Sequence, residues 1–212
     1  MKSLILKDLY NISHNSKAMI LILIVMGAFF IPMNGPVSYV AISTLLCSMM
    51  VVTTFSFDDT VKWNRYALVM PVTRKEIVIS KYIVLLLFSL CGVFIGIIVS
   101  FGAEIFTHNI IVLETLFSGA ASLGIALIFG SIIIPLLFKY GAEKARMLMI
   151  LCFLIPAGIV YAIMNIAQRL NLSLSDTGLL SNLLWFIPLL IIAFVLISVK
   201  ISTRIFNKVE LN

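Results

Sequence analysis

Six apolar stretches, most of them long enough to cross a bilayer, constrain this chain more than any other feature. Their centres contain no Asp, Glu, Lys, Arg or His. A helix rises about 1.5 Å per residue and the hydrocarbon core is about 30 Å thick, so such stretches predict spanning helices. In agreement, 62% of the residues are hydrophobic and 11% are charged, against about 25% charged in soluble domains. We therefore expect an all-α integral membrane protein with one transmembrane domain, residues 1–212.

Proline, glycine and charged residues set the expected span boundaries. The predicted spans are residues 18–32, 37–57, 77–102, 115–138, 147–167 and 183–199. The first is short, so it should borrow polar end residues or thin the bilayer locally. A signal peptide is the competing interpretation, but no small-residue cleavage site follows and further spans come at once. Glu104, His108 and Glu114 predict an outer loop between the third and fourth spans.

The basic residues set the expected orientation. With both termini in the cytoplasm, every lysine and arginine except Arg169 lies on the cytoplasmic side, as the positive-inside rule requires. This distribution accounts for the net charge of +6 without a nucleic-acid partner. The expected location is the plasma membrane, crossed several times.

Residues 2–16 precede the first span and predict an amphipathic helix in the membrane interface. Four aliphatic residues share one face of such a helix: Leu4, Ile5, Leu9 and Ile12. The charged Lys7 and Asp8 are expected elsewhere on its circumference.

Charge is densest between the second and third spans, in Asp58–Glu76. This stretch must lie at or beyond the membrane surface, because its charges cannot enter hydrocarbon. Asp58 or Asp59 is expected to cap a short helix that ends before Pro71. A short charged helix at the membrane surface is typical of a site where another protein docks.

The third span has its own start signal. Thr73 and Glu76 have the spacing of a capping box, which predicts a helix that begins beside the membrane and continues into it. Trp63, Tyr66 and Tyr82 fit an interfacial aromatic belt, and Tyr82 fits it best because the other two stand among charges.

Small and mildly polar residues predict where the spans touch. Two stripes suit close packing within the subunit or at a dimer interface: Gly92, Gly96 and Ser100 on the third span, and Gly119, Ser122, Ala126 and Gly130 on the fourth. The second span carries a polar stripe of Ser43, Cys47 and Thr54. It is a candidate lining for a pathway, although hydrogen bonding inside the bundle explains it equally well.

Several enzyme motifs are absent from the sequence. It contains no GxxxxGK[ST] phosphate loop, HExxH, CxxC or GxSxG. His14 and His108 are predicted on opposite sides of the membrane, which disfavours a zinc site. Asp58 and Asp59 could bind a metal, but helix capping or a protein contact is the preferred interpretation. The lack of ionisable groups in the middle of the spans disfavours a self-energised secondary transporter.

The loop before the third span resembles that of ABC-2 type exporter permeases. Their pattern is approximately Tyr, Leu-Pro, Ser or Thr, Arg-Lys, Ile-Val and Lys-Tyr. The corresponding residues here are Arg65-Tyr66, Met70-Pro71-Val72-Thr73-Arg74-Lys75-Glu76-Ile77-Val78 and Ser80-Lys81-Tyr82. Met70 replaces the commoner leucine. Leu4–Leu9 resembles the amphipathic N-terminal segment of these permeases, and six spans with both termini inside match over the whole length.

The resemblance implies a non-catalytic subunit that forms the translocation pathway of an exporter as a homo- or heterodimer. A separate ATP-binding cassette ATPase would bind ATP and Mg, and no cofactor is implied in this chain. Membrane lipids are the other expected partners. The resemblance assigns the coupling helix seated on the ATPase to Asp58–Lys75. Its candidate contact residues are Asp58, Asp59, Lys62, Trp63, Arg65, Tyr66, Pro71, Arg74 and Lys75. The most similar small members export amphipathic peptides, such as phenol-soluble modulins or antimicrobial peptides.

Two hypotheses from other classes stay open at this point. One is a membrane-embedded lipid-modifying enzyme that uses Asp58 and Asp59 as metal ligands and depends on a divalent metal. The other is a non-transporting scaffold or sensor, which binds partners without any cargo-dependent change in ATP hydrolysis.

Overall fold

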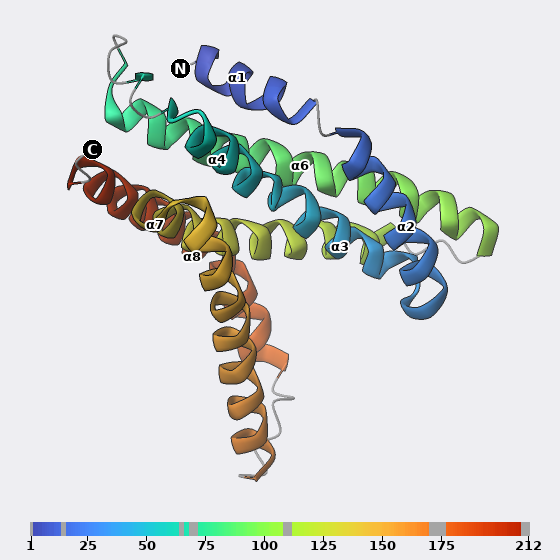
Figure 1. Cartoon of the computed structure of the whole chain (residues 1–212). Coiled ribbons are helices and arrows are strands. Elements are labelled where there is room, and N and C mark those ends of the chain that lie inside the picture. Colours follow the sequence, from blue (N-terminus) through green and yellow to red (C-terminus); the bar gives the residue numbers. More distant parts are fainter. Residues whose placement is uncertain are drawn as a thin grey trace.

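The computed structural model describes residues 2–13, 16–63, 66–67, 72–107, 112–169 and 177–208, excluding the side chains of 16, 106–107, 146, 148–169 and 177–187. The secondary structure in these ranges is helical (Figure 1). The principal helices are α1 (Lys2–Ser13), α2 (Ser16–Asn34), α3 (Pro36–Ser48), α4 (Met50–Thr60), α6 (Arg74–Thr107), α7 (Val112–Arg169) and α8 (Thr177–Lys208).

Five segments of the described residues are long and apolar enough to cross a membrane. They are Lys17–Asn34, Pro36–Thr60, Arg74–Ile105, Val112–Ala145 and Pro188–Lys208. The predicted span 147–167 falls in the second part of α7, where the backbone is helical and the side chains lie outside the described set. The chain is an all-α, multi-pass membrane protein.

The helices turn at residues with special backbone preferences. Gly35 lies between α2 and α3 at φ 83°, and Pro36 occupies the first turn of α3. Backbone N–H groups in the first turn have no partner within the helix, so the lack of an N–H in proline costs no hydrogen bond there. Met49 interrupts the next span, so that α3 and α4 are separate helices. Ser48 Oγ donates to the Leu45 carbonyl at 2.8 Å in the last turn of α3.

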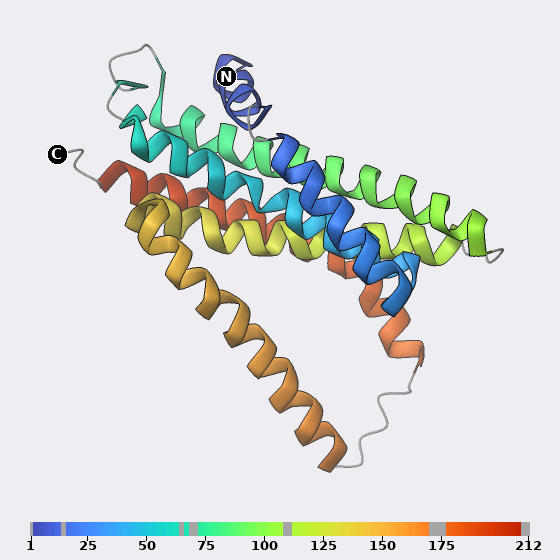
Figure 2. The ribbon, with the colours of Figure 1, turned by 45° about the vertical axis from the view of Figure 1, so that its right-hand side comes forward.

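The helix α7 bends at Gly141, where φ is 75°. Only glycine adopts such a backbone without strain. Up to the bend, α7 packs along α6 and α3, and beyond it the helix runs away from the bundle (Figures 1 and 2).

The most extensive contact between described helices is that of α3 with α6, and glycines make it possible. A Cβ built on Gly92 would lie 2.7 Å from Thr44 Cα, and one on Gly96 would lie 2.8 Å from Val40 Cα. The small-residue stripe of the third span is therefore a packing surface within the subunit, where van der Waals contact between backbones drives association.

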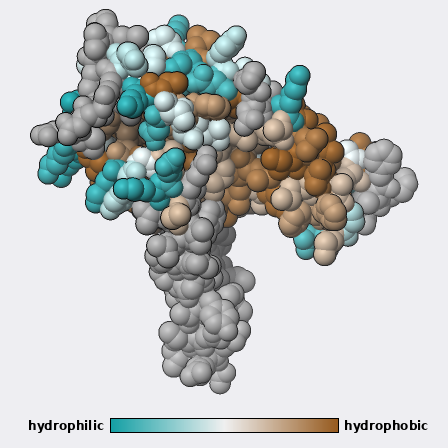
Figure 3. Space-filling view, viewed as in Figure 1, coloured by the Kyte–Doolittle hydropathy of each residue, from teal (hydrophilic) through white to brown (hydrophobic). Residues whose placement is uncertain are grey.

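The two ends of the bundle differ in character. The start of α1 and the end of α8 lie at one end, together with the end of α4, the start of α6 and the bend of α7 (Figures 1 and 2). The turn between α2 and α3, the end of α6 and the start of α7 lie at the other end. Hydrophilic residues gather at the end with the termini, whereas the surface over α2 and α3 is hydrophobic (Figure 3). We call the first end the terminal end.

Two of the three residues predicted in the outer loop, Glu104 and Glu114, lie inside helices, and His108 lies outside the described residues. Glu114 is in the first turn of α7. The helix α6 continues to Thr107, and Glu104 is buried within it at 1% exposure. Its Oε1 accepts hydrogen bonds from Ser100 at 3.1 Å and Thr115 at 2.9 Å. The placement of Glu104 in a loop was wrong, because two hydroxyl donors satisfy the carboxyl inside the packed end of the bundle.

Candidate functional site

The first helix contributes a buried carboxylate. Leu4, Asp8 and Ile12 are the buried residues of α1, and they recur every four positions along one face. Leu9, by contrast, is exposed. The expectation that Asp8 lies away from the buried face was wrong, because Asp8 finds a lysine partner beneath α1.

The end of α4 contributes a second carboxylate, and α6 contributes the lysine. Asp58 follows Thr54 by one helical turn, and both side chains are buried. Lys81 lies seven residues after the start of α6, which is roughly 10 Å along the helix. Three elements distant in sequence thus bring charged groups to one point at the terminal end.

The four charged groups form a compact cluster, which we call the charge cluster: Lys7, Asp8, Asp58 and Lys81. Lys81 Nζ lies 2.6 Å from Asp58 Oδ2 and 2.9 Å from Asp8 Oδ2, and it also donates to Thr54 Oγ1 at 3.2 Å. Lys7 Nζ lies 2.5 Å from Asp58 Oδ1 and 3.2 Å from Asp8 Oδ1. Each lysine therefore bridges the same two carboxylates.

Because the charge cluster is buried, it is stable only when all four of its members are present. The exposed fractions are 1% for Asp8, 4% for Asp58 and 3% for Lys81. Two ammonium groups balance two carboxylates, which lets the cluster lie at the edge of the hydrocarbon region. Removal of one member would leave an uncompensated buried charge, which typically costs about 3–5 kcal/mol. The cluster therefore holds α1, α4 and α6 in one relative position.

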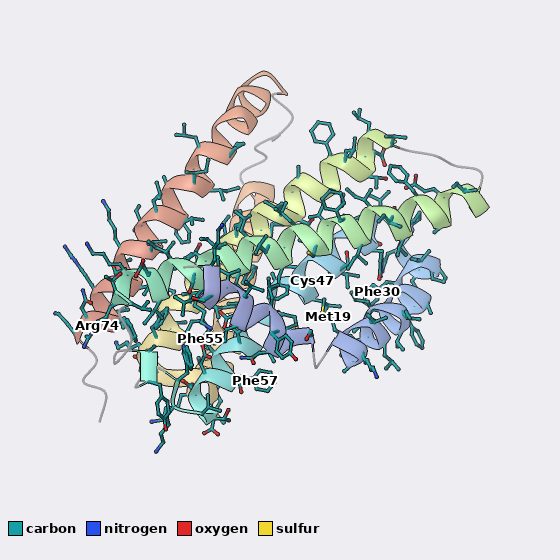
Figure 4. All side chains as sticks on the ribbon, turned by 90° about the horizontal axis from the view of Figure 1, so that it is seen from above. Met19, Phe30, Cys47, Phe55, Phe57 and Arg74 are labelled. Atoms are coloured by element: carbon teal, nitrogen blue, oxygen red, sulfur yellow. The ribbon has the colours of Figure 1, made fainter. Side chains whose placement is uncertain are left out.

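One aromatic ring lies beside each of the two lysines. Lys7 Nζ lies 4.4 Å from the centroid of the Trp63 ring, and Lys81 Nζ lies 4.9 Å from that of Phe55. Phe55 packs edge-on against Phe138 of α7, whose ring contacts Phe206 of α8. Figure 4 shows Phe55 towards the terminal end, with Arg74 nearby and Cys47 farther along the bundle. The aromatic chain thus links the charge cluster to the last two helices.

Asp59 has a structural partner on α7. Its Oδ2 accepts a hydrogen bond from the backbone N–H of Ala142 at 2.6 Å, directly after the bend at Gly141. This is the arrangement of a helix cap, which satisfies an N–H that the bend leaves unpaired. The expectation that Asp58 or Asp59 starts a surface helix was wrong, since α4 continues through both to Thr60.

The start of α6 is fixed by two sets of hydrogen bonds. Thr73 N–H donates to Glu76 Oε2 at 2.9 Å, and Glu76 N–H donates to Thr73 Oγ1 at 3.3 Å, the reciprocal pair of a capping box. Arg74 donates to the Phe206 and Asn207 carbonyls at 3.0 and 2.9 Å. A cation on the last carbonyls of α8 also complements the helix dipole.

The nine candidate coupling residues divide into three groups. Asp58, Asp59 and Arg74 are engaged within the subunit, as described above. Lys62, Tyr66 and Lys75 are exposed, and Trp63 is half-buried under Lys7. Arg65 and Pro71 lie outside the described residues. Of these residues, Trp63 contacts the charge cluster, through Lys7.

The polar stripe of the second span points into the bundle. Ser43 Oγ donates to the Gly92 carbonyl of α6 at 3.0 Å, and Thr54 accepts from Lys81. Cys47 is fully buried. These contacts are of the kind expected from the alternative interpretation, in which the stripe bonds within the bundle.

Tyr82 departs from its expected place in an aromatic belt. It is buried, and its hydroxyl lies 2.6 Å from Ser198 Oγ and 2.9 Å from Ser202 Oγ of α8. The belt assignment for Tyr82 was wrong, because two serines on the facing helix satisfy the hydroxyl inside the bundle.

The charge cluster could have been found only in part from the sequence. Asp8 interrupts an apolar stripe at a spacing of four, and Lys81 interrupts the apolar face that includes Ile77 and Leu85. A charge within an apolar face signals a buried partner. Which carboxylates meet which lysines required the packing of α1 on α6.

The described residues do not point to a metal centre. No group of three or more His, Cys, Asp and Glu side chains with metal-binding geometry occurs among them. Asp58 and Asp59 face different partners, lysines in one case and a backbone N–H in the other. These ion pairs and hydrogen bonds join different helices, so they can pass a movement of one helix on to its neighbours.

The comparisons with known proteins agree with this architecture. Residues 3–207 match the model of a family described as ABC-2 family transporter protein. Neither the comparison with curated proteins nor that with solved structures gave a match. Because the family model covers nearly the whole chain, the protein belongs to the ABC-2 transporter family and is a permease of the ABC-2 type.

Proposed function

We propose that this permease is the membrane subunit of an ATP-binding cassette exporter, driven by a separate ATPase subunit. It would work as a homo- or heterodimer in the plasma membrane, with its terminal end in the cytoplasm. The proposal extends the family assignment to a direction of transport, a partner and an orientation. The positive-inside distribution of lysine and arginine supports the orientation.

The charge cluster is the observation that carries the proposal. It ties α1, α4 and α6 together directly beside the chain that joins α4 to α6. A partner that presses on Lys62, Tyr66 or Lys75 would push all three helices as one unit, because separation would strand a buried charge. Nucleotide-driven closure of an ATPase could in this way be transmitted to α6, which crosses the whole bundle.

The proposed cargo is an amphipathic peptide of the antimicrobial or cytolytic kind. It follows from the resemblance to small permeases of this family. The exposed apolar surface of α2 offers such a cargo a place to partition from the bilayer, with Leu21, Ile24 and Phe29 each more than half exposed.

The test is reconstitution of the full chain with an ATP-binding cassette subunit in lipid. ATP hydrolysis is measured with and without an amphipathic peptide. We expect a stable complex whose rate responds to the peptide, and a loss of this stimulation in Tyr66→Ala. The matched control is Phe117→Ala, an aromatic residue of similar exposure at the opposite end, 69% against 64%.

Three other outcomes have distinct meanings. A stable complex whose ATP hydrolysis does not respond to the peptide would support the exporter and contradict the proposed cargo. Equal loss of stimulation in Tyr66→Ala and Phe117→Ala would contradict a specific role of the exposed residues Lys62, Tyr66 and Lys75 in coupling to the ATPase. Failure to bind any ATPase would contradict the exporter itself.

A further inference from the structure

Helices α7 and α8 enclose a groove near the terminal end that none of the contacts above fill. Its volume is about 390 Å³. Aliphatic side chains form both walls: Ile132, Pro135 and Leu136 on α7, and Ile197, Ile201 and Ile205 on α8. The groove is separate from the charge cluster, and its interpretation does not depend on the proposed ATPase.

The register of the two helices gives the length of the groove. Ser198 donates to the Ser131 carbonyl, and the Phe138 and Phe206 rings lie 5.1 Å apart. Both residue numbers rise together from the first pair to the second, so the two helices are parallel here. The groove extends over the nine residues from Ser131 to Lys139, which are eight steps along the helix. At 1.5 Å per residue it is about 12 Å long. This length fits within one leaflet, which is half of a hydrocarbon core about 30 Å thick.

A cation and an aromatic ring stand at the mouth of the groove. Lys139 and Tyr140 line it and are both exposed. Lys139 Nζ lies 5.0 Å from the centroid of the Tyr140 ring. Within the described part of the chain, Lys139 makes no ion pair with a carboxylate. Its charge is therefore free to attract an anion at the level of the lipid headgroups.

We propose that the groove binds an anionic phospholipid, with one acyl chain between α7 and α8 and the phosphate at Lys139. The aliphatic walls suit the acyl chain. Because the groove fits within one leaflet and Lys139 stands at its mouth, a lipid whose acyl chain lies in the groove would have its phosphate beside the Lys139 ammonium. A zwitterionic lipid would fill the groove equally well but would gain less from Lys139. The buried Ser131 hydroxyl, at the end of the groove away from Lys139, has no hydrogen-bond partner among the described residues. It can bond a carbonyl of its own helix after rotation, so no lipid contact is assigned to it.

Native mass spectrometry of the purified full chain tests the site. Phosphatidylglycerol and phosphatidylcholine with identical acyl chains are added in competition, and bound lipid is counted for each variant. We expect the wild type to prefer phosphatidylglycerol. Lys139→Gln should weaken its binding roughly fivefold, the effect of one lysine near a charged lipid surface, and should remove the preference. Ile201→Trp should reduce the binding of both lipids by filling the groove.

Lys200→Gln is the matched control, because Lys200 is an exposed lysine on α8 that does not line the groove. It should retain the wild-type preference. An equal effect of Lys139→Gln and Lys200→Gln would overturn the site in favour of diffuse surface attraction. So would equal binding of both lipids by the wild type. Full lipid binding by a folded Ile201→Trp variant that no longer dimerises would instead assign the groove to a second copy of the chain.

Discussion

At the scale of single residues, partners decide what a charged side chain does in this membrane protein. Lys81 would be expected to avoid a buried position, yet it is accommodated by two carboxylates and a threonine hydroxyl. A buried ion pair adds little net stability compared with apolar packing, and its value lies in the cost of breaking it. The charge cluster therefore specifies which helix faces meet.

A double-mutant cycle at Lys81 tests this account. Lys81→Met should lower the free energy of unfolding in detergent by about 3–5 kcal/mol, since two buried carboxylates would share one lysine. Adding Asp58→Asn should cost less than the sum of the single changes, because it removes the stranded charge. Thermal and denaturant unfolding of the purified chain measure both effects.

Lys200→Met serves as the control for Lys81→Met, because Lys200 is exposed. Its effect should stay within about 0.5 kcal/mol, as for most surface substitutions. If the two lysine variants were equally stable, the charge cluster would have no role in holding the helices.

At the scale of helices, close packing of α3 on α6 depends on the absence of side-chain atoms. The backbones of the two helices approach so closely at Gly92 and Gly96 that a single methyl group would meet Cα atoms of α3. No hydrophobic effect drives this contact inside a bilayer, so the fit itself supplies the stabilisation. The Ser43 bond to the Gly92 carbonyl adds to it.

Alanine substitutions along α6 should separate packing from helix propensity. Gly92→Ala should destabilise the protein by about 1–3 kcal/mol, the usual cost of overpacking. Gly102→Ala has open space around its Cβ and should stabilise by up to about 1 kcal/mol, because alanine favours helices more than glycine. Thermal unfolding of both variants measures the difference, and a milder effect at Gly92 than at Gly102 would refute the packing role.

At the scale of the whole molecule, the chain collects its termini and most of its charged connections at one end. The α1 helix lies over α4 and α6 there, and Arg74 joins the start of α6 to the end of α8. If the proposed ATPase binds at this end, it meets helices that are already linked to one another. The opposite end carries the short turn at Gly35 and the buried Glu104.

Sided labelling tests the orientation proposed for the two ends. In a background with the three native cysteines replaced, single cysteines are introduced at Lys62, Lys208 and Leu113, all exposed. A membrane-impermeant maleimide should label only Leu113→Cys in intact cells. In inside-out vesicles it should label Lys62→Cys and Lys208→Cys instead. Labelling of the last two from opposite sides would contradict the shared terminal end.

The sequence alone determined the helical membrane class, because long apolar stretches without charges have no other stable conformation in a bilayer. It also determined the start of α6, since the capping box of Thr73 and Glu76 is a contact within one turn. The tertiary structure alone decided the roles of Asp8, Asp58, Lys81, Glu104 and Tyr82. Each of these side chains meets a partner at least 11 residues away, and local spacing carries no information about such pairs. In a membrane, burial follows from which helix faces meet, and that is settled only when the helices pack.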